Sequence, residues 1–323
     1  MTSGIMYEFS NRTVYGIESE AIRYTWAGYF LFVIISSLIG DTAILIASIK
    51  YRAFKLHKII VVIIQHIAVC DLMVSLTDVL PKLISVIASE NVFSTFLCYL
   101  SPYLRYYFNP ANVLLICAMC SSKLYTLKSP LRSGAVTLTR THMMCVGCWL
   151  AAFTFPVAFL ILDWKDIYFS YRGYQCNYAY SSPVYHWLKP LLAVVFLFIP
   201  TCLVVATSVN LLIIAKKVAR RCRGSLKWQG IMTTVLIATV YCISIIPMVV
   251  YRVGESRIKI DDKSRSFYFT HLYRIAISFP FLNIISNFYI YSLTVSGFRD
   301  FVWSTMQLPF RLSTKMGAFT RLW

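Results

Sequence analysis

Seven long apolar stretches, separated by short polar segments, run through this chain of 323 residues. Each stretch is long enough to cross a membrane, because a helix needs about 20 mostly apolar residues to span the hydrocarbon layer. None shows the strict alternation of apolar and polar residues that the strands of a membrane barrel require. The pattern therefore predicts seven transmembrane helices, over residues 24–49, 59–88, 96–125, 143–161, 188–215, 230–250 and 270–294.

The seven helices leave room only for short tails. In the tail that follows the last span, Phe298 and Phe301 recur at helical spacing beside Arg299, a pattern typical of a helix that lies in the membrane surface. We therefore predict an all-α membrane protein, a seven-transmembrane helix bundle with a short amphipathic eighth helix. Its three parts are an N-terminal tail over 1–23, the bundle over 24–294, and the amphipathic helix with a cytoplasmic tail over 295–323.

The composition indicates lipid as the solvent for most of the chain. Hydrophobic residues make up 58% of the sequence and charged residues 14%, whereas soluble domains carry about 25% charged residues. The formal net charge is +18, and a basic chain can bind nucleic acid. Here the bases flank the predicted spans, so anionic lipid headgroups are the simpler partner. We therefore expect contact with membrane lipid and none with nucleic acid.

The bases are concentrated on one side of the predicted membrane. Four segments contain more than half of the 31 Lys and Arg residues, with Asp300 as their only acid; they are 50–58, 126–142, 216–229 and 295–323. Short cytoplasmic loops are enriched in Lys and Arg, so these segments are predicted to be cytoplasmic. The N-terminus is then extracellular, and Asn11, in Asn11-Arg12-Thr13, is a candidate glycosylation site.

Two of the ten cysteines, Cys98 and Cys176, lie on the predicted outer side. An oxidising exterior allows them to pair, and the resulting disulfide would fasten the loop before the fifth span to the third helix. Apolar and polar residues alternate within that loop on both sides of Gly173, which favours a β-hairpin with an aromatic face. The alternative is an irregular aromatic loop at the membrane interface, where Tyr and Trp collect.

Ionisable side chains within the spans are candidates for function, because a charge in the bilayer is costly. The candidates in the outer half are Asp78, Lys82, Arg105, Arg252 and Arg274. A rise of about 1.5 Å per residue places Asp78 and Arg105 at a similar depth. They can form a buried ion pair with each other. Alternatively, Arg105 can receive an anionic ligand, since its planar guanidinium matches a carboxylate.

A second set of polar residues lies deeper in the spans, where their side chains can face one cavity. The set is Asp41, Asp71, Asn112, Asn283 and Asn287. Carboxylate and amide oxygens suit a hard cation or a cluster of ordered water molecules. We therefore predict a cation or water site near Asp71, with sodium as the candidate ion and no other metal or cofactor.

Several short motifs, in order along the chain, resemble those of the rhodopsin-like (class A) G-protein-coupled receptors over residues 24–303. The matches are Gly40, 67–72, Ser129-Pro130-Leu131-Arg132, Trp149, Pro200, Pro247, 287–291 and Phe298-Arg299. Within these motifs, Asp41 stands where the family has Asn, and Phe288 stands where it has Pro. The resemblance implies a plasma-membrane receptor, not an enzyme, that binds an extracellular ligand and signals through heterotrimeric G proteins. By the same resemblance, the residues that face the G protein are Lys123, Pro130, Lys227 and Tyr291.

The chain departs from the family pattern at the inner ends of its helices. The family's Asp-Arg-Tyr at the end of the third span is Ser122-Lys123-Leu124, and Lys227 stands near a position where many members carry an acid. Lys123 keeps a positive charge but lacks the planar fork of Arg. These departures imply either a loose inner gate with high basal signalling or weakened coupling. We favour weakened or non-standard coupling.

The resemblance also excludes some classes of ligand. Amine receptors of the family carry an Asp where this chain has Arg105, and visual pigments carry a Lys where it has Phe281; amines and retinal are therefore not expected. A cationic outer cavity beneath an aromatic hairpin suits an anionic small molecule or a peptide. Two alternatives are a receptor that binds ligand without productive G-protein coupling, and a secondary transporter. No internal repeat of the kind that transporters show is evident.

Overall fold

The structure is a computed structural model that describes residues 20–50, 58–90, 92–128, 137–163, 167–170, 173–178, 188, 191–222, 226–255 and 263–305. Within these residues, seven helical spans are long and apolar enough to cross a membrane. The predicted seven-helix bundle is therefore confirmed. Two predicted site residues, Asn11 and Pro130, lie outside the described residues, as do the side chains of Lys227 and Arg252.

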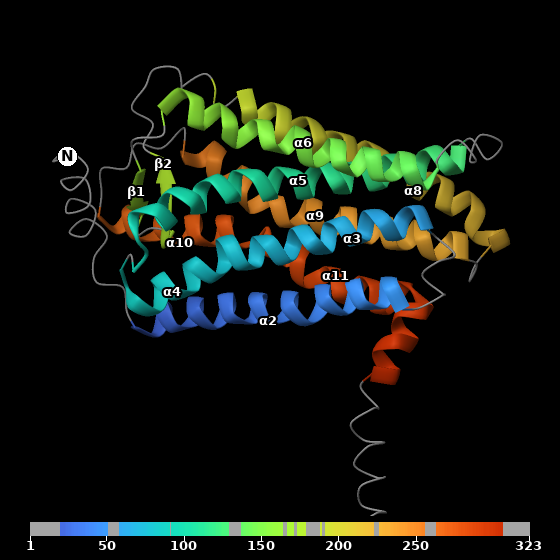
Figure 1. Ribbon diagram of the computed structural model, residues 1–323, viewed down its shortest axis with the longest axis horizontal. Helices are drawn as coiled ribbons and strands as arrows, with labels where there is room; N and C mark the ends of the chain where they lie inside the picture. Colours follow the sequence, from blue (N-terminus) through green and yellow to red (C-terminus); the bar gives the residue numbers. More distant parts are fainter. Residues whose placement is uncertain are drawn as a thin grey trace, which may run out of the picture.

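The spans follow one another up and down through the bundle (Figure 1). Their elements are α2 (Glu20–Lys50); α3 (Lys58–Val74), η2 (Ser75–Val79) and α4 (Leu80–Ala88); α5 (Thr95–Lys128); α6 (Leu138–Asp163); η4 (Val194–Phe198) and α8 (Ile199–Cys222); α9 (Leu226–Glu255); and α10 (Lys263–Ser278) and α11 (Phe281–Thr294). Several helices extend beyond the apolar stretches predicted from the sequence; α6, for example, begins at Leu138 rather than at 143. A helix satisfies its own backbone hydrogen bonds, so it continues past the hydrocarbon edge into polar sequence.

Two spans contain a widened helical turn directly before a proline. The π-helical segments η2 and η4 each end two residues before Pro81 and Pro200, respectively. Proline has no N–H to donate, and its ring clashes with the carbonyl four residues earlier. The helix accommodates this by a turn of five residues, in which the Leu80 N–H donates to the carbonyl oxygen of Ser75. The widened turn in the second span carries Asp78.

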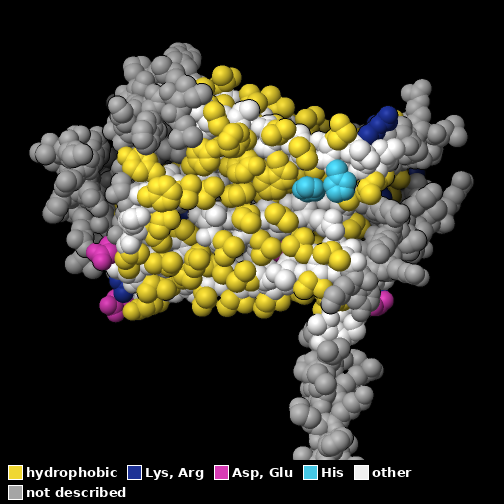
Figure 2. All heavy atoms as spheres, in the orientation of Figure 1, with side chains coloured by type: hydrophobic (Ala, Val, Ile, Leu, Met, Phe, Trp, Pro, Cys, Tyr) yellow, Lys and Arg dark blue, Asp and Glu magenta, His cyan; other side chains and the backbone are white. Residues whose placement is uncertain are grey.

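Apolar side chains cover the outside of the bundle as well as filling it. Ile63 and Leu115 are completely buried in the core, whereas Phe96 and Leu293 are 70% and 78% exposed. On the face drawn in Figure 2, hydrophobic side chains extend along the helices, and charged side chains gather toward the two ends. So large an exposed apolar surface indicates contact with lipid.

The last span ends in a separate short helix. Residues 296–305 form this helix, which turns away from the bundle in Figure 1. Phe298 and Phe301 are buried on one side of it, and Arg299 and Asp300 are exposed on the other. The amphipathic eighth helix expected from the sequence is therefore present. We call this end of the bundle the tail end.

A β-hairpin covers the opposite end, which we call the hairpin end. Strands β1 (Ile167–Ser170) and β2 (Gln175–Tyr178) pair antiparallel, with Phe169 opposite Cys176. Tyr174, in the turn, has a left-handed backbone conformation with φ of 49°. Of the two alternatives that the sequence left open for this loop, the structure has the hairpin.

Candidate functional site

A buried cluster of three charges lies in the half of the bundle nearest the hairpin. The ammonium of Lys82 donates a hydrogen bond to Asp78 Oδ1 at 2.8 Å, and Arg105 Nε lies 3.1 Å from the same oxygen. Asp78 and Lys82 are each only 2% exposed. The structure therefore brings Asp78 and Arg105 together, in agreement with the similar depth predicted for them. One carboxylate faces two cations, so the cluster holds one positive charge in excess.

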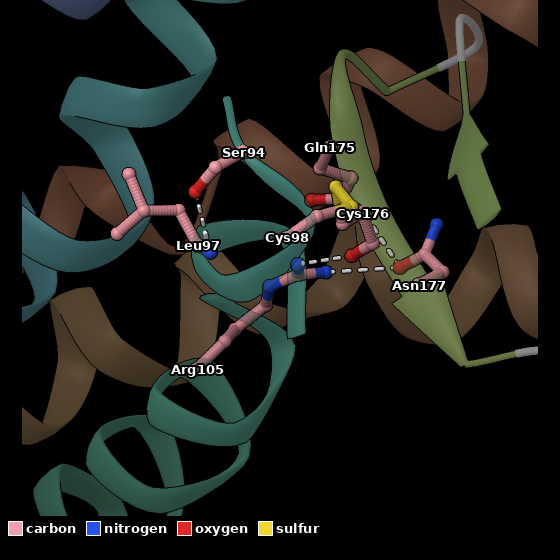
Figure 3. The surroundings of a disulfide bond; sticks show 7 residues. All are labelled: Ser94, Leu97, Cys98, Arg105, Gln175, Cys176 and Asn177. Carbon is pink, nitrogen blue, oxygen red and sulfur yellow. Dashed lines mark hydrogen bonds between the residues drawn. A yellow bond between two sulfur atoms is a disulfide. The ribbon is translucent and has the colours of Figure 1, made fainter. Parts of the chain in front are cut away.

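Arg105 also fastens the hairpin to the third span. Its Nη1 donates to Asn177 Oδ1 at 3.0 Å, and its Nη2 donates to the carbonyl oxygen of Cys176 at 2.7 Å. Figure 3 shows the guanidinium reaching from α5 to strand β2 beside the disulfide. Hydrogen bonds to a charged group are among the stronger ones in proteins. The Arg105 guanidinium is thus held by Asp78 on one side and by the hairpin on the other.

The disulfide and two further contacts hold the hairpin in place. Cys98 at the start of α5 is bonded to Cys176, with 5.4 Å between their Cα atoms, as the sequence predicted. The Gln175 amide donates to the hydroxyl of Tyr273 at 3.0 Å. Arg274 lies over the ring of Tyr174, with 4.7 Å between the guanidinium carbon and the ring centroid. The five predicted ligand residues are therefore divided: Asp78, Lys82 and Arg105 form the cluster, Arg274 packs against the hairpin turn, and the side chain of Arg252 is not described.

A cavity of about 170 Å³ adjoins the cluster. Asp78 and Lys82 line it, and so do Cys98 and Cys176. The ammonium of Lys82 also lies over the ring of Phe281, 4.9 Å from its centroid. Among the described residues, Lys82 makes one hydrogen bond, to Asp78. An ammonium has three N–H donors, so two remain for a group that enters the cavity.

Two of the deeper polar residues, Asn112 and Asn287, bind Asp71. Asn112 donates to one oxygen of the Asp71 carboxylate, and Asn287 donates to the other at 2.7 Å. Asp41 is 1% exposed and accepts a hydrogen bond of 2.6 Å from Ser37. The buried oxygens without a hydrogen-bond partner among the described residues include those of Asn112, Asn283, Asn287 and Tyr291. Such oxygens can coordinate a hard cation or accept hydrogen bonds from ordered water.

At the tail end, Lys123 is buried against the sixth span. Lys123 is 7% exposed. Its ammonium occupies the space beside Gly230 that the side chain of a larger residue would need. A Cβ atom on Gly230 would come within 2.6 Å of Lys123 Nζ. One turn further along α9, Thr233 donates to the hydroxyl of Thr294 on α11 at 2.7 Å. Tyr291, on the same helix as Thr294, is 1% exposed.

Sequence reasoning missed three neighbours of the predicted residues. Asn177 follows Cys176, and the predicted disulfide already placed that segment above the third helix; its contact with Arg105 was therefore within reach. Phe281 and Gly230 carried no such signal. Their positions beside Lys82 and Lys123 depend on how the sixth and seventh spans rotate against their neighbours, which a single sequence does not specify.

Comparison with known proteins agrees with this geometry. A family model described as 7 transmembrane receptor (rhodopsin family) matches residues 40–291. The chain is 23% identical over 190 residues to the annetocin receptor of Eisenia fetida and 27% identical over 184 residues to cephalotocin receptor 1 of Octopus vulgaris. These matches cover 55% and 54% of this chain and 45% of each relative, so the chain spans about half the length of the curated relatives it matches. The chain belongs to the rhodopsin family of seven-transmembrane receptors, and it is a multi-pass membrane protein and not an enzyme.

Proposed function

We propose that this chain is a plasma-membrane receptor that binds an anionic extracellular ligand at its hairpin end and signals through heterotrimeric G proteins. The observation that carries the proposal is the cluster of Asp78, Lys82 and Arg105 beside a cavity. A buried charge without a full complement of partners is costly. A ligand carboxylate would balance the excess positive charge of this cluster.

The ligand is a small acid or a peptide that presents a carboxylate. Lys82 is the group that would meet it, because this side chain lines the cavity and has donors available. Arg105 would act behind it, since its guanidinium is held by the hairpin and Asp78. The two similar receptors are named for the ligands annetocin and cephalotocin. For this chain, we propose only that the ligand has a carboxylate.

The orientation of the receptor follows from its charges. The helix ends at the tail end flank the four segments enriched in Lys and Arg, and such segments face the cytoplasm. The hairpin end is then extracellular, which agrees with a disulfide there, because disulfides persist in oxidising compartments. Asn11 is the proposed glycosylation site in the extracellular tail.

The G protein would contact the tail end, where Lys123, Pro130, Lys227 and Tyr291 are the proposed contributors.

Lys123 supports a second candidate function, a receptor that binds ligand but couples weakly. Its ammonium is enclosed between helices and packs against the backbone of Gly230. A compact ammonium there lacks the planar, forked donor set of Arg, which would limit its contacts with a partner.

We also propose a sodium ion beside Asp71. The Asp71 carboxylate and the unpartnered oxygens of Asn112, Asn283 and Asn287 provide the ligands, and Asp41 adds a second carboxylate nearby. Oxygen ligands suit a hard cation. When bound, the ion would balance buried negative charge between the second, third and seventh spans. Its removal would therefore change the packing of these spans against one another.

A panel of matched acids tests the proposed function. Cells expressing the receptor would be exposed to organic acids and to peptides with a free carboxyl terminus, each paired with its amide or methyl ester. Nucleotide exchange on the G protein is the readout. We expect at least one acid to stimulate exchange and its neutral partner to be at least tenfold weaker. Equal responses to acids and their neutral partners would overturn the role of the cluster.

A further inference from the structure

The cavity beside the charged cluster reaches the lipid-facing surface of the bundle. Leu76 and Leu97 line it, and these side chains are 42% and 45% exposed. Both belong to membrane spans, the second and the third. In Figure 3, Leu97 is directed away from strand β2, to which the neighbouring Cys98 is bonded. The exposed edge of the cavity therefore faces lipid, in the seam between the second and third spans.

The walls of the cavity change from apolar at this edge to charged at its inner end. Leu100 and Leu104 continue the apolar wall along α5, over roughly 10 Å from Leu97 to Leu104 at the rise of an α-helix. The inner wall contains Lys82 and Asp78, each 2% exposed. A molecule that fills the cavity thus meets lipid at one end and the buried residues Lys82 and Asp78 at the other.

We propose that this seam admits a carboxylic acid with an aliphatic tail directly from the outer leaflet of the membrane. The proposal rests on the function proposed above, since it assigns the chemical class of the acid and its route. The carboxylate would accept hydrogen bonds from Lys82 and balance the excess positive charge that Arg105 brings to the cluster. The first carbons of the tail would pack between Leu97 and Leu104.

The size of the cavity sets the form of this ligand. A cavity of about 170 Å³ is smaller than the pockets of about 300–1,000 Å³ that enclose drug-sized ligands. It therefore encloses a carboxylate and the first few carbons. The rest of a longer tail would lie outside, along Leu76 and Leu97 in the lipid. The hairpin closes the extracellular side of the cavity, with Tyr174 and Cys176 among its lining.

Dodecanoic acid is the probe that tests the proposal. Full-length receptor would be embedded in phosphatidylcholine nanodiscs, and its apparent melting temperature followed against dodecanoic acid, methyl dodecanoate and succinic acid. We expect saturable stabilisation by dodecanoic acid alone, because methyl dodecanoate lacks the charge and succinic acid lacks the tail. Equal stabilisation by the ester would overturn the proposal, since it would show that the tail suffices.

Three variants separate the route from the charge. Lys82→Met removes the ammonium, and Leu97→Trp fills the lipid-facing edge. Leu150→Trp is the matched control, since Leu150 is 65% exposed on α6 and does not line the cavity. We expect the first two to weaken dodecanoic acid at least tenfold and the control to match the unmodified receptor. Unchanged binding in Leu97→Trp would overturn the route through the seam.

The proposed function and the proposed route can fail separately. If succinic acid or a peptide carboxylate binds through Lys82 while dodecanoic acid does not, the route is wrong and the anion site stands. If no acid depends on Lys82, the anion site itself is wrong. Dodecanoic acid with a photoactivatable diazirine on its tail provides a test without mutation. Labelling of Leu76 or of residues 97–104 supports the route, and labelling confined to other segments overturns it.

Discussion

At the scale of single residues, Arg105 connects the buried charges to the hairpin. The sequence left two roles open for it, an ion pair with Asp78 and the capture of an anionic ligand. The structure gives the ion pair and adds two hydrogen bonds to the hairpin. Arg105 therefore positions the hairpin and also contributes charge, while Lys82 is the cation that lines the cavity.

These two roles of Arg105 can be separated by mutation. Arg105→Ala removes both the charge and the hairpin contacts, whereas Asn177→Ala removes only one neutral partner of the guanidinium. We expect Arg105→Ala to abolish the response to an activating acid and Asn177→Ala to lower its potency by less than tenfold. Nucleotide exchange, with surface expression as the control, provides the measurement. Identical losses in the two variants would mean that Arg105 acts only through the hairpin.

Lys123 is the residue at which coupling is expected to differ from that of related receptors. Lys123→Arg restores the planar, forked donor group, so we expect stimulated nucleotide exchange to rise. Lys123→Met keeps a similar length without charge and should not raise it. Exchange would be measured on purified G protein with an acid that activates the unmodified receptor. An unchanged or lower rate in Lys123→Arg would show that Lys123 does not limit coupling.

At the scale of elements, the first and seventh spans pack closely because of one glycine. A Cβ atom on Gly40 would lie 2.8 Å from Cβ of Phe288, which is an atom next to the backbone that cannot swing aside. Phe288 also packs against Phe298, with 5.8 Å between the ring centroids. The close approach thus connects α2, α11 and the eighth helix.

Gly40→Ala should therefore destabilise the receptor by about 1–3 kcal/mol, because overpacking forces the two helices apart. Gly28→Ala is the control on the same helix, since no atom lies within 4 Å of a Cβ there. Alanine favours the helix by about 0.5–1 kcal/mol over glycine, so Gly28→Ala should be neutral or slightly stabilising. Apparent melting temperatures in detergent provide the comparison. Equal effects of the two substitutions would rule out the close contact.

The elements also mark the limit of what the sequence predicted. Apolar length alone predicted every span, and the helical rise predicted that Asp78 and Arg105 share a depth. The π-helical turns before Pro81 and Pro200 were not predicted, although each follows from the missing N–H of proline. The break before α11 at Pro280 was missed for the same reason.

At the scale of the whole molecule, the two ends of the bundle differ in their charged groups. The tail end bears the basic segments, Lys123 and the eighth helix, and the hairpin end bears the disulfide and the Asp78–Lys82–Arg105 cluster. Charge asymmetry along the chain predicts that the tail end faces the cytoplasm. The cavity beside the charged cluster was not predictable, because it depends on the side-chain directions of two neighbouring spans and on the cover that the hairpin provides.

The central claim is that an anionic ligand activates this receptor through Lys82. The most direct test compares nucleotide exchange in the unmodified receptor and in Lys82→Met, over a full concentration range of each acid that activates the former. Lys82→Arg, which keeps the charge, is the matched variant. We predict at least a tenfold loss of potency in Lys82→Met and a smaller loss in Lys82→Arg. The same potency in all three receptors would contradict the account.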